Sequence, residues 1–168
     1  MELTTDVLLR GEIWNRTINE LSPIFTTRTN YSIYILCMSI GIMYDQRIDK
    51  FEDEDIEPKS VPRNVMQNQD NGKLDFMFQA AILSTKTEEL SEDERLELAF
   101  GDKEENEGFN KIGFLTQFAN FGVTKLSEQI GETPVESMEN IKSFLVSTVE
   151  GNNFDINAIP DDVWLEDM

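Results

Sequence analysis

The stretch GFLTQFANFGVTKL, residues 113–126, is apolar around most of its circumference if it forms a helix. Phe114, Phe118 and Phe121 then share one side, because they are four and three residues apart. A second side carries smaller apolar residues, namely Leu115, Ala119, Gly122, Val123 and Leu126. A helix that is apolar on nearly all sides belongs inside a protein, so the stretch predicts an all-α bundle built around it. The alternative is an exposed aromatic stripe that docks onto a partner.

Five further segments have the periodicity or the end signals of helices. They cover residues 3–21, 31–44, 74–83, 91–100 and 133–149. Together with the segment 109–130, which contains the opening stretch, they predict a single-domain bundle of five or six helices with little or no sheet. Ser91 and Glu94 have the spacing of a capping box, and Pro134 stands in the first turn of the last helix.

Individual positions in these segments carry further expectations. Gly11 lies inside the first predicted helix, where it weakens the helix. In the 74–83 segment we expect the core to be formed by Phe76, Phe78, Ala80, Ala81 and Leu83. The sequence Asp-Asn-Gly at residues 70–72 predicts a turn.

We expect one globular domain, because 168 residues can bury a sizeable core. This helical domain covers residues 1–150 and includes an acidic loop near 45–63, where five acids are followed by two prolines. Residues 151–168 are expected to form an acidic tail with a short helix that contains Trp164.

The negative charge is concentrated in the second part of the chain, and the formal net charge is −19. Residues 1–50 hold five basic and six acidic side chains, whereas residues 51–168 hold nine basic and twenty-seven acidic ones. A field of this sign repels phosphate, so we expect no direct binding to nucleic acid. It favours a larger protein partner with a basic surface, although acidic residues also serve solubility alone.

The residue types argue against several kinds of chemistry. The chain has no histidine, which removes the commonest general base and the commonest zinc ligand. Its single cysteine, Cys37, lies in the most apolar segment and forbids an internal disulfide. Phosphate-cradling, dinucleotide-binding and nucleophile-elbow motifs are missing. We therefore predict no catalytic residue, no cofactor and no enzyme activity, while an enzyme that uses carboxylates with a divalent ion stays an alternative.

The location of the protein follows from two further stretches. The longest apolar run, residues 31–44, is too short to cross a membrane. Residues 1–10 lack the basic start and the long apolar stretch of a secretory signal. The lone cysteine fits a reducing compartment, so we expect a cytoplasmic protein without a membrane span.

Two acidic stretches are the candidate partner-binding sites. The first contains Glu52, Asp53, Glu54 and Asp55. It lacks the glycine and the ligand alternation of an EF-hand, so we predict no metal site there. The second stretch is Asp161, Asp162, Val163, Trp164 and Leu165. An aromatic anchor among acids is typical of a peptide that docks into a groove on a partner; in the alternative, this tryptophan folds back on its own domain.

Three parts of the chain carry a resemblance to a known family. In PIFTTRTNYSIYILCMSIGI, residues 23–42, the matching positions are Phe25, Thr29, Tyr31 and Gly41. RLELAFG, residues 95–101, is a short charged helix before a glycine break. In GFLTQFANFGVTKLSEQI, residues 113–130, the matching positions are Phe118, Ala119, Asn120, Gly122 and Leu126. Together these parts resemble small accessory proteins encoded beside bacterial DNA phosphorothioation (sulfur-modification) restriction systems.

The resemblance implies a non-catalytic role in defence against phage or foreign DNA, exercised through a larger protein partner. The acidic loop at 51–57 and the acidic tail depart from the family pattern. We therefore predict an accessory or adaptor protein of a bacterial defence system and leave its oligomeric state open. The alternative is an inhibitor that imitates DNA, with carboxylates of residues 51–57, 88–107 and 161–167 in place of phosphates.

Overall fold

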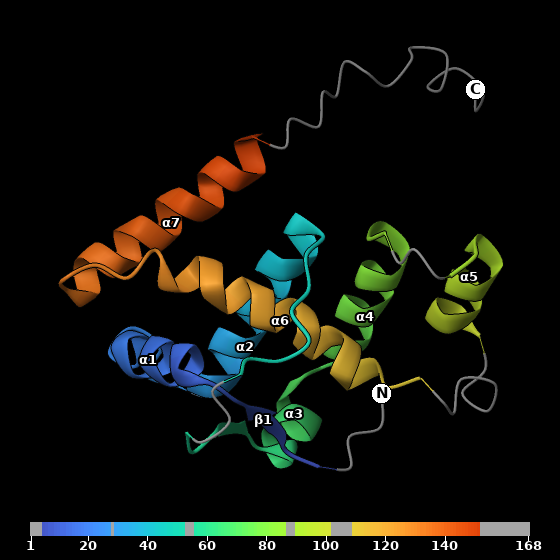
Figure 1. Cartoon of the computed structure of the whole chain (residues 1–168), viewed down its shortest axis with the longest axis horizontal. Helices are drawn as coiled ribbons and strands as arrows, with labels where there is room; N and C mark the ends of the chain where they lie inside the picture. Colours follow the sequence, from blue (N-terminus) through green and yellow to red (C-terminus); the bar gives the residue numbers. More distant parts are fainter. Residues whose placement is uncertain (1–4, 28, 53–55, 87–89, 102–108, 152–168) are drawn as a thin grey trace.

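The computed structural model describes residues 5–27, 29–52, 56–86, 90–101 and 109–151 (Figure 1). These residues form seven helices and one two-stranded sheet. In chain order the elements are β1 (Val7–Leu9), α1 (Glu12–Leu21), α2 (Thr29–Tyr44), β2 (Lys59–Val61), α3 (Arg63–Gln69), α4 (Lys73–Ser84), α5 (Glu92–Phe100), α6 (Lys111–Ser127) and α7 (Pro134–Gly151). The predicted all-α, single-domain class is confirmed, and the additional helix is the short α3.

Helix α6 lies at the middle of the bundle, packed along α2 and also against α1 and α4 (Figure 1). Phe118 is fully buried and Phe114 nearly so. Phe121 is half-buried, and its ring contacts Tyr44 of α2 with 5.8 Å between the ring centroids. The predicted internal position of this helix is therefore confirmed. The alternative of an exposed aromatic stripe is wrong, because side chains of the neighbouring helices cover the rings.

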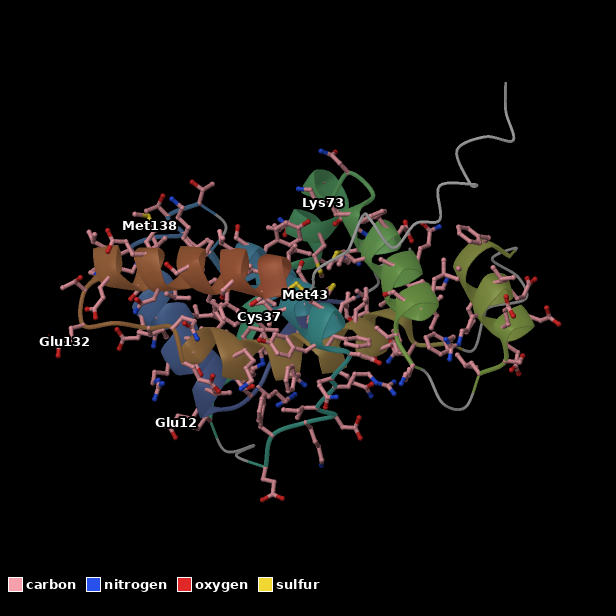
Figure 2. All side chains as sticks on the ribbon, turned by 90° about the horizontal axis from the view of Figure 1, so that it is seen from above. Glu12, Cys37, Met43, Lys73, Glu132 and Met138 are labelled. Carbon is pink, nitrogen blue, oxygen red and sulfur yellow. The ribbon has the colours of Figure 1, made fainter. Side chains whose placement is uncertain are left out.

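Helices α2 and α6 approach each other until their main chains touch at two glycines. A Cβ atom added to Gly122 would lie 1.7 Å from the carbonyl oxygen of Cys37. A Cβ atom added to Gly41 would lie 2.0 Å from the carbonyl oxygen of Phe118. Both distances are far below van der Waals contact, so only glycine permits this approach. Cys37 lies near the middle of the molecule (Figure 2), where burial raises the pKa of its thiol well above the ordinary value.

A buried amide ties a third helix and a connecting segment to α6. Asn120 accepts a hydrogen bond from Nε1 of Trp14 in α1 at 2.9 Å. Its Nδ2 donates to the carbonyl oxygen of Ile48 at 3.0 Å, and the main-chain nitrogen of Ile48 donates to the carbonyl oxygen of Gln117 at 3.0 Å. The prediction of a loop near residues 45–63 is therefore only partly correct. The chain after α2 is bound along α6, and the end of this region forms strand β2.

The N-terminal segment differs from the sequence prediction. Instead of one helix over residues 3–21, the structure has strand β1 followed by α1. The strand pairs antiparallel with β2, with Val7 opposite Val61. Its first and last residues are buried and the middle one, Leu8, is exposed, which is the alternation of a strand with one buried face. Gly11 has a φ of 102° just before α1, so it permits the turn into the helix rather than weakening its middle.

The predicted Asp-Asn-Gly turn is confirmed, and it joins α3 to α4. Asn71 and Gly72 have φ values of 50° and 79°, both in the left-handed region. The Asp70 carboxylate accepts hydrogen bonds from the main-chain nitrogen of Leu74 at 3.0 Å and from the hydroxyl of Tyr31 at 2.9 Å. The turn is thereby fixed both to α2 and to the start of α4.

The predicted start signals of the later helices are also confirmed. At the start of α5, the Glu94 carboxylate accepts a hydrogen bond from the main-chain nitrogen of Ser91 at 2.7 Å, and the Ser91 hydroxyl accepts one in return. Helix α7 begins at Pro134, and Phe144 stacks on Tyr44 with 6.5 Å between the ring centroids. None of the helices in the described residues combines the length and the apolarity needed to cross a membrane.

Replacing Gly122 by alanine should destabilise the protein strongly. The added methyl group would meet the main chain of Cys37, so the two helices must move apart. We expect the free energy of unfolding to fall by at least about 2 kcal/mol, because overpacking outweighs the gain of about 1 kcal/mol in helix propensity. Urea denaturation followed by circular dichroism measures the change.

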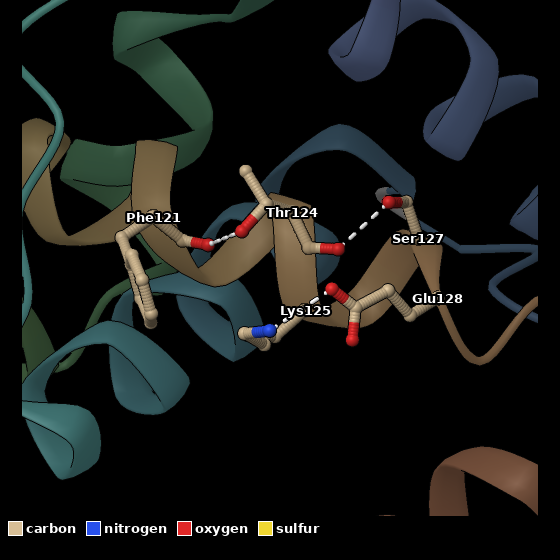
Figure 3. A network of polar contacts seen from close by, with 5 residues as sticks. All are labelled: Phe121, Thr124, Lys125, Ser127 and Glu128. Atoms are coloured by element: carbon tan, nitrogen blue, oxygen red, sulfur yellow. Dashed lines mark hydrogen bonds and ion pairs between the residues drawn. The ribbon is translucent and has the colours of Figure 1, made fainter.

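The matched control for this variant is Lys125→Ala in the same helix. Lys125 forms a partly exposed ion pair with Glu128 at 2.9 Å, beside the hydroxyls of Thr124 and Ser127 (Figure 3). Removing such a surface pair changes stability by no more than about 0.5 kcal/mol. Equal stability of Gly122→Ala and the wild type would contradict the close approach of α2 and α6.

The buried phenol of Tyr34 predicts a loss of stability at high pH. Burial raises the pKa of Tyr34 from 10.0 to about 12, although the hydrogen bond with the Thr116 hydroxyl, at 2.9 Å, lowers it. The folded state therefore holds the phenol proton more tightly than the unfolded state. The stabilising contribution is fully present below pH 10 and is lost as the pH rises to about 12. Two pKa units correspond to about 3 kcal/mol.

The comparison that isolates this effect is Tyr34→Phe, with unfolding measured by urea at pH 8, 10 and about 12. The variant should lose less stability than the wild type over this range. Cys37, whose pKa is also raised, is present in both proteins, so its contribution cancels. Parallel curves for the two proteins would show that Tyr34 is not the titrating group.

Candidate functional site

Exposed large apolar side chains gather on two parts of the described structure. Among nine such positions, three lie along α7, namely Val135, Met138 and Val146. Four others lie on the neighbouring helices α4 and α5, namely Phe76, Leu83, Leu96 and Phe100. The two phenylalanines are 67% and 66% exposed, more than any of the other seven. We call these four side chains the hairpin face, and it is the candidate functional site.

Helices α4 and α5 form an antiparallel pair at one end of the molecule (Figure 1). Nε2 of Gln79 donates to the carbonyl oxygen of Ala99 at 3.1 Å. A guanidinium nitrogen of Arg95 donates to the carbonyl oxygen of Thr85 at 3.1 Å. These two bonds set the register of the pair. Leu83 therefore lies at the level of Leu96, and Phe76 lies two to four residues beyond the level of Phe100, an offset of about 3–6 Å, since a helix rises about 1.5 Å per residue.

The four side chains also point to the same side of the pair. On α4, Phe78 faces the core and Gln79 faces α5. Phe76 and Leu83 follow roughly 50° further round, on the side away from the core, at 100° per residue. On α5, the buried Ala99 faces α4, and Leu96 and Phe100 turn from it in the direction opposite to the core-packed Leu98. Helical geometry therefore places all four side chains on the same side of the two helices.

The sequence prediction of which α4 residues form the core is partly wrong. Phe76 and Leu83 were expected in the core, but both are exposed, and Ala80 is only half-buried. The residues that do face the core are Leu74, Phe78, Ala81 and Ile82. Their spacing of four, three and one residues is the pattern of a single helix face. The signal was present in the sequence, but apolar residues lie on several sides of α4 and so hide which side is inward.

Carboxylates surround the apolar surface on the α5 side. Glu92, Asp93 and Glu97 are exposed on α5. The described residues 90–101 contain four acidic side chains and one basic side chain. One of these acids has a local structural role, because Glu94 closes the capping box, and the hydrogen bonds from Ser91 lower its pKa. The basic residue, Arg95, donates to the main-chain carbonyl of Thr85, the residue after α4.

A second surface feature is a groove of about 620 Å³ between β1 and the first half of α6. Asp6, Asp49 and Gln117 contribute to its lining. Asp6 already accepts a hydrogen bond from the main-chain nitrogen of Arg63 at 2.8 Å, and Gln117 binds the chain after α2 through its carbonyl oxygen. Both residues therefore have a role in holding the fold.

The candidate sites predicted from the sequence fall mostly outside the described residues. Glu52 is described and exposed, whereas residues 53–55 and 161–165 lie outside. The acids invoked for DNA imitation within residues 102–107 and 161–167 also lie outside. In the part of the chain that the structure describes, no three His, Cys, Asp or Glu side chains lie close enough to share a metal ion.

Comparisons of the chain with protein-family models, with curated proteins and with solved structures return no match.

The orientation of α4 can be tested by a matched pair of substitutions two residues apart. Phe76→Ala should change the free energy of unfolding by no more than about 0.5 kcal/mol, because the ring is mostly in water. Phe78→Ala should lower it by about 3–5 kcal/mol, because the ring is 1% exposed and a cavity is left. Chemical denaturation of both variants measures the difference. Similar losses for the two would place Phe76 in the core after all.

Proposed function

We propose that this protein is a non-catalytic accessory or adaptor protein that binds a larger protein partner through the hairpin face. The observation that carries the proposal is the exposure of Phe76 and Phe100 on one side of the α4–α5 pair, together with Leu83 and Leu96. Clustered exposed apolar side chains of this kind are typical of protein interfaces, where aromatic residues are enriched. The acids around it favour a partner with a basic surface.

The resemblance to accessory proteins of DNA phosphorothioation systems supports a role in bacterial defence. Several positions that carry this resemblance belong to the scaffold, including Gly41, Asn120 and Gly122. A shared scaffold is compatible with different partners, because function depends on the surface that a fold presents. We propose that in this protein the hairpin face is that surface.

The proposal is tested by capturing the partner with the full chain in cells that naturally make the protein. The bait carries a photo-crosslinking phenylalanine analogue at position 100. Wild-type bait should crosslink one larger protein, and Phe76→Ser/Phe100→Ser should recover at least roughly tenfold less of it in a pull-down, as expected when two anchors are removed. The matched control is Val135→Ser/Met138→Ser on α7, which also removes two exposed apolar side chains and should retain the partner.

Equal recovery by all three baits, or crosslinking to no protein, would contradict the proposal. The defence role is tested separately, by phage plating on cells that carry the wild-type gene, a deletion or the Phe76→Ser/Phe100→Ser allele. Plating should rise to the same extent for the deletion and the allele. Unchanged plating for the deletion would remove the defence role and leave the binding role to the capture result.

A further inference from the structure

The shape of the hairpin face determines what kind of element it fits. Two packed antiparallel helices form a shallow groove along their outer side. Along it, Phe76 and Leu83 of α4 are seven residues or about 10.5 Å apart, and Leu96 and Phe100 of α5 are four residues or about 6 Å apart. These spacings equal the rises between residues i and i+7 and between residues i and i+4 of a third helix. A helix laid along the groove can therefore place apolar side chains against both α4 and α5.

A strand does not fit the same place. The main-chain groups of α4 and α5 are committed to helical hydrogen bonds and to their caps. Adding a strand requires a row of unpaired main-chain groups at a sheet edge, and this surface consists of side chains. The groove thus favours recognition through an amphipathic helix.

The charge around the groove determines the polar side of that helix. Glu92, Asp93 and Glu97 are exposed along α5, and the described residues 90–101 hold four acidic side chains and one basic side chain. A second copy of this chain would bring the same charge to the interface, and like charges oppose association. An anionic lipid surface would be repelled for the same reason. A segment rich in lysine or arginine is attracted instead.

We propose that the hairpin face binds a basic amphipathic helix of the partner protein, with apolar residues between α4 and α5 and basic residues toward Glu92, Asp93 and Glu97. This inference rests on the proposed function and names the partner element that the same site receives. Phe76 and Phe100 are the apolar anchors, and the α5 carboxylates select the sign of the partner's charge.

The test uses three synthetic peptides of about 18 residues, a length at which an isolated helix can form. The first contains leucine at i, i+3, i+4 and i+7 with lysine elsewhere. The second has the same composition in an order that leaves no apolar face, and the third has glutamate in place of lysine. Fluorescence anisotropy measures their binding to the full chain at about 0.15 M salt, where surface charge is already screened beyond about 8 Å.

The first peptide should bind the wild type at least roughly tenfold more tightly than the second or the third. Phe76→Ser/Phe100→Ser should weaken its binding at least roughly tenfold, and Val135→Ser/Met138→Ser on α7 should leave it unchanged. Glu92→Gln/Asp93→Asn should weaken it several-fold and reduce its dependence on salt. Circular dichroism of each variant confirms that it is folded.

Equal binding of the first two peptides, or no effect of the phenylalanine substitutions, would show that only net charge is recognised and would overturn the inference. If sedimentation shows that the wild type is a dimer and that Phe76→Ser/Phe100→Ser is a monomer, the face binds a second copy of the chain instead. If the bait crosslinks its native partner through position 100 but binds the three peptides equally well, only this inference is overturned. If the protein distinguishes the three peptides but the bait captures no partner, only the proposed function is overturned.

Discussion

The contact between the main chains of α2 and α6 at Gly41 and Gly122 sets the position of the other elements. Because the two helices touch there without side chains between them, residues further along both helices come close enough to bond. Tyr34, seven residues before Gly41, meets Thr116, six residues before Gly122, across the pair. Asn120, two residues before Gly122, is left facing α1 and accepts the hydrogen bond of Trp14. Any separation of the two helices therefore also disturbs α1 and the chain after α2.

The aromatic side of α6 extends this constraint to the candidate site. Phe114 contacts Phe118 and Phe109, with ring centroids 5.1 and 5.5 Å apart, and it meets Phe78 of α4 at 6.0 Å. These edge-to-face contacts fix which side of α4 is inward. Phe76, two residues from Phe78, is then turned about 200° from it and must point outward. The exposure of the hairpin face is thus a consequence of the packing of α4 on α6.

The sequence predicted the elements whose signals are local. The all-apolar character of α2 and α6, the Ser91–Glu94 capping box and the turn at residues 70–72 each depend on residues close together in the chain. Strand β1 escaped prediction because three residues are too few for a periodic pattern and its partner β2 lies about fifty residues away. Non-local pairing of this kind is decided by tertiary packing rather than by propensity.

The candidate site was missed for a different reason. Every apolar residue of α4 could have belonged to the core. The sequence alone did not show which side of α4 would pack against α5 and which would stay exposed. The register with α5 depends on side chain to main chain bonds such as those of Gln79 and Arg95, which no sequence pattern encodes. The acidic tail around Trp164, which the sequence favoured instead, lies outside the described residues and stays a prediction.

The composition of α5 links binding at this site to local stability. The helix has nine residues, of which Ala99 is buried and Leu98 packs partly buried against the core, so it depends largely on its capping box and on α4. Short helices of this kind are marginal by themselves, and the four carboxylates of this one repel each other. A basic partner would relieve that repulsion and cover Leu96 and Phe100 at the same time. By mass action it would then stabilise α5 while leaving the α2–α6 contact unchanged, so binding at the hairpin face and the stability of α5 are expected to be coupled.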